Sequence, residues 1–166
     1  MMNTIAILFL MFCFALTGQA QSKKALFLGN SYTAFNNLPQ MVAEVALSAG
    51  DTLIFDSNTP GGFTLEGHST NEGSLNKIKS GNWDFVVLQE QSQRPSLPIE
   101  QVMENVFPYA HILDSIINEF NPCGETAFYM TWGYTYLMQS AIHLLITLKA
   151  RGGYLLEASS IYPLYL

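Results

Sequence analysis

Four short apolar runs, each ending at a glycine or a polar turn, alternate along the chain with segments that favour helices. Helices are expected between the runs: residues 38–50 and 99–120 carry apolar side chains at helical spacing, and residues 65–78 are expected to hold a short polar helix. Strands that alternate with helices form a parallel sheet with helices on both faces. The order of the elements therefore predicts a three-layer α/β fold. The four runs are KALFLG, DTLIFDSN, WDFVVLQ and TAFYMTW, beginning at Lys24, Asp51, Trp83 and Thr126.

Prolines and a glycine mark the expected limits of these helices. Pro39 lies near the start of the first helix, and Gly50 lies just past its end, where each residue type is common. Pro108 falls inside the stretch 99–120. It must kink or split that helix, because proline lacks an N–H and clashes with the preceding turn.

The N-terminal 20 residues have the layout of a secretory signal peptide. An apolar core runs from Ile5 to Leu16, and small residues ending in Ala20 follow it, although no Lys or Arg precedes the core. The alternative is a membrane-spanning helix, which needs about 20 apolar residues and therefore more than this run offers. We expect cleavage after Ala20, one domain over residues 21–166, no stable membrane insertion after cleavage, and a secreted or periplasmic location.

Charge and cysteine content argue against several classes of function. The net charge is −6 and the sequence has no basic cluster, which argues against nucleic acid as a partner. Removal of the signal peptide takes Cys13 with it and leaves Cys123 alone, so no internal disulfide is expected. The histidines, His68, His111 and His143, are too far apart in sequence to suggest a metal site, and no cofactor is expected.

Polar residues and glycines gather where the expected strands end. In parallel α/β sheets, ligands bind at the carboxyl ends of the strands. We therefore expect these groups to lie near one another along a single edge of the sheet. They are Gly29-Asn30-Ser31, Gly61-Gly62, Gln89-Glu90-Gln91 and Trp132-Gly133.

Three of these strand ends offer the parts of a serine nucleophile site. A serine hydroxyl needs a base to take its proton, and the oxyanion that it creates needs preorganised donors. Ser31, at the first turn of a helix, has its own N–H free, and Gly62 offers a second N–H that no side chain blocks. A side-chain amide of Gln89 or Gln91 is a third donor. The alternative is an ordinary turn, because Gly, Asn and Ser all favour turns.

The order of four motifs adds to this hypothesis. GNSYT follows the first strand, GGF-x-L-x-x-H follows the second, and VVLQEQSQRPS and FYMTWG come after them, all between residues 25 and 133. This set resembles the secreted SGNH/GDSL-type serine hydrolases, in a branch with G-N-S in place of G-D-S. The resemblance implies a flavodoxin-like sheet and hydrolysis of carboxylic esters. It also implies small-molecule or glycan substrates, such as acetyl or other short acyl groups on carbohydrate.

Roles for individual residues follow from the resemblance. Ser31 matches the nucleophile, and the N–H groups of Ser31 and Gly62 match two oxyanion donors. Where the family usually supplies an asparagine side chain, this chain has Gln89, with Gln91 as the second choice.

Two further residues of these motifs are candidate binding residues. Asn30 is the middle residue of G-N-S. His68 matches a histidine that the family often has in support of the pocket; the alternative is a polar residue on a helix.

The last block of the family, D-x-x-H, supplies the base and the aspartate that orients it. The nearest match here is S-A-I-H, in which His143 matches the base and Ser140 stands at the aspartate position. His143 follows Gly133 by ten positions, whereas the family places roughly one more α/β unit there. We expect the chain to lack that unit near its C-terminus, and residues 134–149 to pack in its place as a helix.

The leading hypothesis is a secreted serine esterase that acts through a Ser31 acyl-enzyme. The alternative is a catalytically impaired or inactive relative that only binds a ligand, or a non-functional truncated product. This alternative arises because Ser140 cannot supply the charge that an aspartate places opposite the developing imidazolium. A third hypothesis, a nucleotide-binding domain, lacks the spaced glycines and the lysine of phosphate-binding loops.

Overall fold

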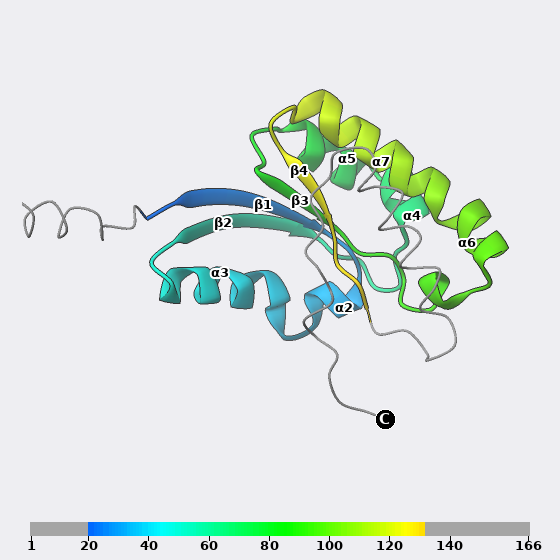
Figure 1. Cartoon of the computed structure of the whole chain (residues 1–166), viewed down its shortest axis with the longest axis horizontal. Helices are drawn as coiled ribbons and strands as arrows, with labels where there is room; N and C mark the ends of the chain where they lie inside the picture. The colour runs from blue at the N-terminus through cyan, green and yellow to red at the C-terminus, as the bar shows by residue number, and fades with distance from the viewer. Residues whose placement is uncertain (1–19, 132–166) are drawn as a thin grey trace, which may run out of the picture.

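The computed structural model describes residues 20–131, and a four-stranded sheet lies at the centre of that region (Figure 1). All neighbouring strands are parallel, and the register places Leu28 beside Asn58 on one side and Leu88 on the other. The predicted α/β class is confirmed, and the sheet fits a flavodoxin-like three-layer fold. The order across the sheet is β2 (Thr52–Asn58), β1 (Ser22–Leu28), β3 (Phe85–Leu88) and β4 (Glu125–Phe128).

Helices lie on both faces of this sheet. They are α2 (Ser31–Ala34), η1 (Phe35–Asn37), α3 (Leu38–Ser48), α4 (Leu65–Thr70), α5 (Glu72–Lys79), η2 (Arg94–Ser96), α6 (Ile99–Asn105) and α7 (Phe107–Phe120). α4 and α5 pack against α7 over one face, and α3 packs against β2 on the other (Figure 1). Within residues 20–131, no helix has the length and apolar character needed to cross a membrane.

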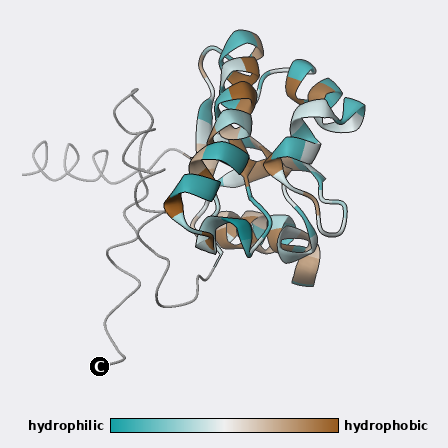
Figure 2. Ribbon diagram, turned by 90° about the vertical axis from the view of Figure 1, so that its right-hand side faces the viewer, coloured by the Kyte–Doolittle hydropathy of each residue, from teal (hydrophilic) through white to brown (hydrophobic). Residues whose placement is uncertain are grey.

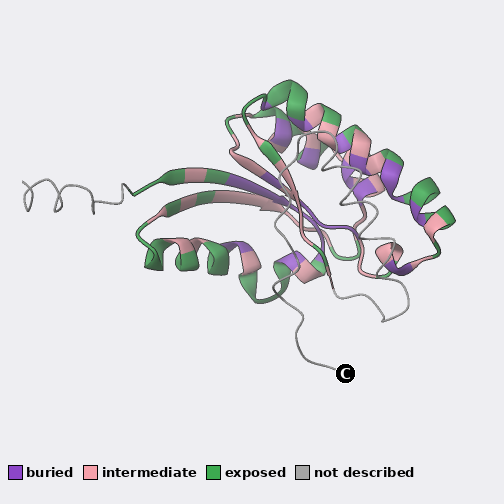
Figure 3. Ribbon diagram, in the orientation of Figure 1, coloured by how far each residue is buried: buried purple, intermediate pink, exposed green. Residues whose placement is uncertain are grey.

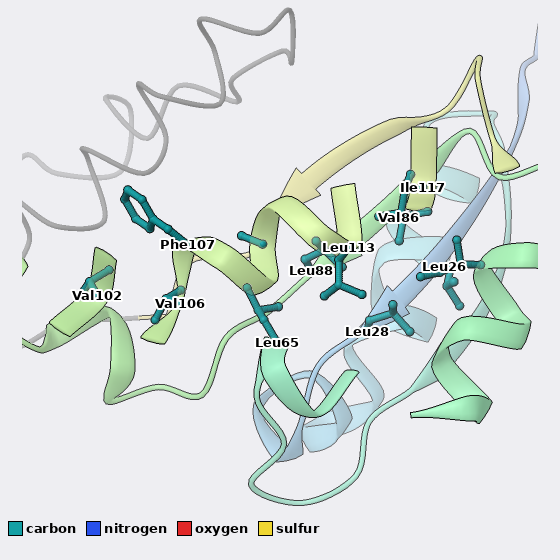
Figure 4. Close-up of a cluster of buried hydrophobic side chains, with 12 residues drawn as sticks. Leu26, Leu28, Leu65, Val86, Leu88, Val102, Val106, Phe107, Leu113 and Ile117 are labelled. Carbon is teal, nitrogen blue, oxygen red and sulfur yellow. The ribbon is translucent and has the colours of Figure 1, made fainter. Parts of the chain in front are cut away.

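The hydrophobic core lies between the sheet and α7 (Figure 4). Alternate residues of β1 and β3 point into it, as the period of two along a strand requires. Leu113 and Ile117, which lie four positions apart on α7, meet them from the helix side. Each fully buried side chain of this size contributes about 1.5–3 kcal/mol relative to exposure, so this layer is a main source of stability. The strand residues are Leu26, Leu28, Val86 and Leu88, all fully buried.

The layer that contains α3 is more open to solvent (Figure 3). Met41, Val42 and Val45 belong to the apolar positions that the sequence places at helical spacing, yet all three are exposed in the described part of the chain. Beneath this layer, Phe27 and Phe55 pack edge to face, with ring centroids 6.4 Å apart. The two sides of the sheet therefore differ strongly in how completely they are covered.

A proline and an asparagine set two helix boundaries. The predicted break at Pro108 is confirmed, because α6 and α7 meet there and Pro108 lies in the first turn of α7, where an N–H has no intrahelical acceptor. The single helix expected over 65–78 is two helices. Asn71 caps the second, its Oδ1 accepting a hydrogen bond from Ser74 N at 2.9 Å.

Polar and apolar segments alternate along the helices, as Figure 2 shows.

Several sequence predictions fall on other parts of the chain. The predicted signal peptide, apart from Ala20, lies outside the described residues. The expected helix over 134–149 and the predicted gap between Gly133 and His143 lie outside them as well.

Candidate functional site

The order of the strands reverses between β1 and β3. The chain first adds β2 on one side of β1 and then places β3 on its other side. Connections leave such a point toward opposite faces of the sheet, which opens a crevice where ligands bind. The Gln89 N–H donates to the Leu28 carbonyl at 2.8 Å, so the strand ends after β1 and β3 meet at this point.

Ser31 begins helix α2 directly after the end of β1, and its side chain is exposed. Asn30 is the N-cap, and its Oδ1 accepts a hydrogen bond from Tyr32 N at 3.1 Å. The N–H of Ser31 is the first of the helix, where no intrahelical acceptor exists. An exposed hydroxyl and an N–H that the helix leaves unpaired therefore stand together at the reversal point.

The side chain of Gln89 holds the Ser31 turn from beneath and is fully buried. Its Oε1 accepts hydrogen bonds from Asn30 N at 3.0 Å and from the Thr33 hydroxyl at 2.9 Å. Its Nε2 donates to the carbonyl of Glu90. Both ends of the amide are thus hydrogen-bonded inside the protein, so Gln89 supports the turn, and its role as an oxyanion donor stays a prediction.

Gly29 is required for this contact. A Cβ at position 29 would lie 2.3 Å from Thr33 Oγ1 and 2.7 Å from Gln89 Oε1, much closer than atoms of this kind approach. Any other residue here would push apart the hydrogen-bonded groups that shape the turn. The glycine of the G-N-S motif therefore has a packing role.

His68 supports the same turn from α4, with its ring fully buried. Its Nε2 lies 2.9 Å from the Gly29 carbonyl, and its Nδ1 lies 2.7 Å from Ser74 Oγ. A carbonyl oxygen only accepts, so Nε2 carries the proton and the neutral ring accepts the Ser74 hydroxyl at Nδ1. Burial lowers the pKa of His68 and so favours this neutral form. His68 lies behind the turn and fixes the end of β1.

The loop that follows β2 is tied to the Ser31 turn as well. Asn30 Nδ2 donates a hydrogen bond to the carbonyl of Phe63 at 2.8 Å. Gly62, the residue before Phe63, is exposed and has a φ of +72°, a left-handed conformation that favours glycine. Asn30, Ser31 and Gly62 therefore belong to two loops that contact each other directly.

Glu90 is a buried carboxyl group at this edge that the sequence did not identify as a site residue. It is 7% exposed, and its carboxylate accepts hydrogen bonds from Gln91 N at 2.6 Å and, more weakly, from Leu65 N at 3.4 Å. Within residues 20–131 it has no ion-pair partner, because the Arg94 guanidinium pairs with Glu66 instead, at 3.2 Å. Burial raises the pKa of Glu90 to about 7.

The remaining predicted residues lie farther along or outside the described chain. Gln91 Oε1 accepts hydrogen bonds from the N–H groups of Gln93 at 2.9 Å and Arg94 at 3.3 Å, which closes the loop leading into η2. His143, the predicted base, lies outside the described residues.

An open cavity of about 430 Å³ lies beside Ser31. Its walls come from α2, η1, the start of α3 and the segment after β4. Asn36 and Asn37 turn the chain between α2 and α3, each with a φ of 53°, a region that asparagine enters more readily than most residues. We call this cavity the Ser31 pocket. It is lined by Ser31, Tyr32, Phe35, Asn36, Leu38, Met41 and Tyr129.

The fold is similar to that of a solved structure. It is the crystal structure of a DUF4886 family protein from Bacteroides uniformis ATCC 8492, with a TM-score of 0.56 and 17% sequence identity. The match covers 78% of this chain and 62% of the other, so this chain spans less than two thirds of that protein's length. No protein-family model and no curated protein matches the sequence. At this level of identity the similarity shows the fold alone.

Proposed function

We propose that this protein is a serine hydrolase of the SGNH type that cleaves carboxylic esters, with Ser31 as the nucleophile. The observation that carries the proposal is the position of the Ser31 hydroxyl. It is exposed at the point where the strand order reverses, in a turn held by buried contacts to Gly29 and Gln89, and on the wall of a pocket. An ordinary surface turn needs none of this support.

The proposed reaction has two stages. Ser31 Oγ forms a bond to the ester carbonyl carbon while its proton passes to a base, for which His143 is the candidate. The N–H groups of Ser31 and Gly62 stabilise the oxyanion, and its collapse breaks the bond to the alcohol oxygen, which leaves with the proton from the base. Water then attacks the acyl-enzyme with help from the same base and releases the carboxylic acid.

The buried contacts support this proposal because an oxyanion site depends on donors that are already in place before the reaction. Asn30 joins both loops: its N–H reaches Gln89, and its Nδ2 reaches Phe63, the neighbour of Gly62. A shift of about 1 Å in such a site lowers the rate by about a hundredfold. The hydrogen bonds around Asn30 limit shifts of that kind between the two loops.

A second candidate function is binding without turnover. The observation that favours it is Ser140, which stands where the resemblance calls for an aspartate. Loss of that carboxylate from an intact triad lowers turnover by about 10⁴. In this case the Ser31 pocket binds an ester or acid, and the hydroxyl does not react.

The test is hydrolysis of p-nitrophenyl acetate and p-nitrophenyl butyrate by the purified chain, compared with Ser31→Ala. We expect kcat/KM to fall by about 10³-fold or more in the variant, because the nucleophile is lost. Ser48→Ala is the matched control, since Ser48 is an exposed serine at the end of α3 whose hydroxyl donates a hydrogen bond to the Val45 carbonyl.

Two further measurements separate the candidate functions. A fluorophosphonate probe is expected to label Ser31 in the wild-type chain and in Ser48→Ala, with the adduct located by mass spectrometry. His143→Ala is expected to lower kcat/KM with little change in the affinity for the carboxylic acid product. Equal hydrolysis rates for wild type and Ser31→Ala would refute the hydrolase and leave the binding function.

A further inference from the structure

The Ser31 pocket has an unusual lining for a surface feature. Phe35 is 73% exposed and Met41 is 49% exposed, and both contribute to its wall together with Leu38. The exposed part of a large apolar side chain contributes little to the stability of the folded chain itself. Gathered around one cavity, they offer apolar surface that a ligand can cover, which is typical of a binding site.

The lining also excludes some kinds of ligand. None of the residues that line the pocket in the described part of the chain carries a charge at neutral pH. A phosphate or a carboxylate bound deeply here would lose its water without gaining a charged partner, which is unfavourable. A polyol such as a sugar needs several polar partners, and the lining offers mainly aromatic and aliphatic carbon.

The volume of the pocket indicates the size of its ligand. At about 430 Å³, it exceeds what an acetyl group fills. A water molecule, which is close to a methylene in size, occupies about 30 Å³ of liquid. The pocket therefore has room for an apolar chain of roughly six to ten carbons. Its volume lies within the usual range for ligand pockets.

From these observations we infer that the Ser31 pocket holds the acyl chain of the substrate, and that this chain is a medium-length aliphatic or aryl group. The inference rests on the proposed function, because it places the ester carbonyl at Ser31. An acyl carbon bonded to Ser31 Oγ projects its chain along the wall that contains Ser31. Phe35, Leu38 and Met41 then lie against the chain, and the alcohol part of the ester stays outside this pocket.

This substrate class differs from the short acyl groups on carbohydrate that the sequence resemblance implies. Each methylene buried in an apolar site raises kcat/KM by about fourfold through the hydrophobic effect. We therefore expect kcat/KM to rise along the series p-nitrophenyl acetate, butyrate, hexanoate and octanoate. Butyrate is expected to exceed acetate by about fifteenfold, since it adds two methylenes.

Met41→Trp tests the location of the chain. The larger side chain is placed to fill the pocket, so the ratio of kcat/KM for hexanoate to that for acetate is expected to fall at least tenfold. Val45→Trp is the matched control. Val45 lies one helical turn further along α3, is 69% exposed and is not part of the pocket lining, so the ratio should be unchanged.

The outcomes separate this inference from the proposed function. Ser31-dependent hydrolysis that is fastest for acetate, or equal ratios in Met41→Trp and wild type, overturns the inference and leaves the hydrolase in place. Hydrolysis that does not depend on Ser31 refutes the hydrolase. In that case octanoate binding is measured by calorimetry. Binding that is weakened tenfold in Met41→Trp but not in Val45→Trp supports the inference that the pocket holds an aliphatic chain. Absence of binding overturns that inference.

Discussion

The two sides of the Ser31 turn are built in opposite ways. Behind the turn, polar groups are buried: Gln89 and His68 are fully enclosed, and every polar side-chain atom of these two residues has a hydrogen-bond partner. In front of it, apolar side chains are exposed, with Phe35 at 73%. This arrangement reverses the usual distribution of polar and apolar groups in a soluble protein.

This difference in burial indicates different roles for the two sides of the Ser31 turn. Buried hydrogen bonds fix positions, because a displaced donor or acceptor in a dry environment costs about 1–3 kcal/mol. Exposed apolar groups contribute little to the stability of the chain alone. When a ligand covers them, the removal of their apolar surface from water favours binding. In the proposed function, the buried side fixes the geometry of the site and the open side binds the ligand.

The largest expected effect breaks the buried side. Gly29→Ala places a Cβ where Thr33 Oγ1 and Gln89 Oε1 already lie, so overpacking and loss of hydrogen bonds add together. We expect the free energy of unfolding to fall by about 4 kcal/mol, measured by urea denaturation. Gly61→Ala is the control, because its Cβ would meet nothing within 4 Å, and its expected change is below about 1 kcal/mol. Similar losses in both variants would contradict the close-approach argument.

An intermediate effect sharpens the comparison through pH. The pKa of Glu90 is raised by burial from 4.5 to about 7, so the folded state holds this proton more tightly than the unfolded state. The free energy of unfolding therefore decreases as the pH rises from about 4.5 through about 7. Glu90→Gln removes this decrease. At pH 8 we expect the free energy of unfolding of the variant to exceed that of wild type by at most about 3 kcal/mol, and at pH 4 we expect no such increase.

The Glu90 measurement compares two proteins at each pH. His68 has a lowered pKa and acts in the other direction, since its protonation in the unfolded state lowers the free energy of unfolding as the pH falls. This contribution is common to wild type and Glu90→Gln, so it cancels in their difference. A difference that does not change between pH 4 and pH 8 would show that Glu90 titrates normally.

The smallest expected effect concerns the open side. Phe35→Ser removes a large ring that is already 73% exposed, so the free energy of unfolding should change by less than about 0.5 kcal/mol. The same variant should weaken octanoate binding or hexanoate hydrolysis several-fold, because the ring lines the Ser31 pocket. A stability loss of about 2 kcal/mol or more would instead make Phe35 part of the hydrophobic core.

Much of the fold follows from local sequence signals. The strand up to Leu28, the helix from Leu38 and the break at Pro108 each depend on residues within a few positions of one another, and the structure confirms all three. The division at Asn71 was missed, although asparagine is a preferred N-cap residue and the acidic Glu72 follows it in the first turn. Local chemistry is sufficient to identify features of this kind.

The site was less predictable, because its details depend on contacts between distant residues. The sequence predicts Gln89 at a strand end, but the direction of its amide depends on Asn30 and Thr33, more than fifty positions away. Glu90 was missed for the same reason, since only the packed structure buries a carboxylate beside Leu65. Met41 was expected on a helical apolar stripe, and its place in the pocket wall requires the turn at Asn36.

The hydrogen bonds of Gln89 also make the Ser31 turn depend on a distant part of the chain. Ser31 follows β1 closely, yet the side chain that shapes its turn comes at the end of β3, beyond α3, β2, α4 and α5 in the chain. Pairing of β1 with β2 is therefore insufficient to form the turn. The turn therefore has all of its supporting hydrogen bonds only when residue 89 is in place beside it.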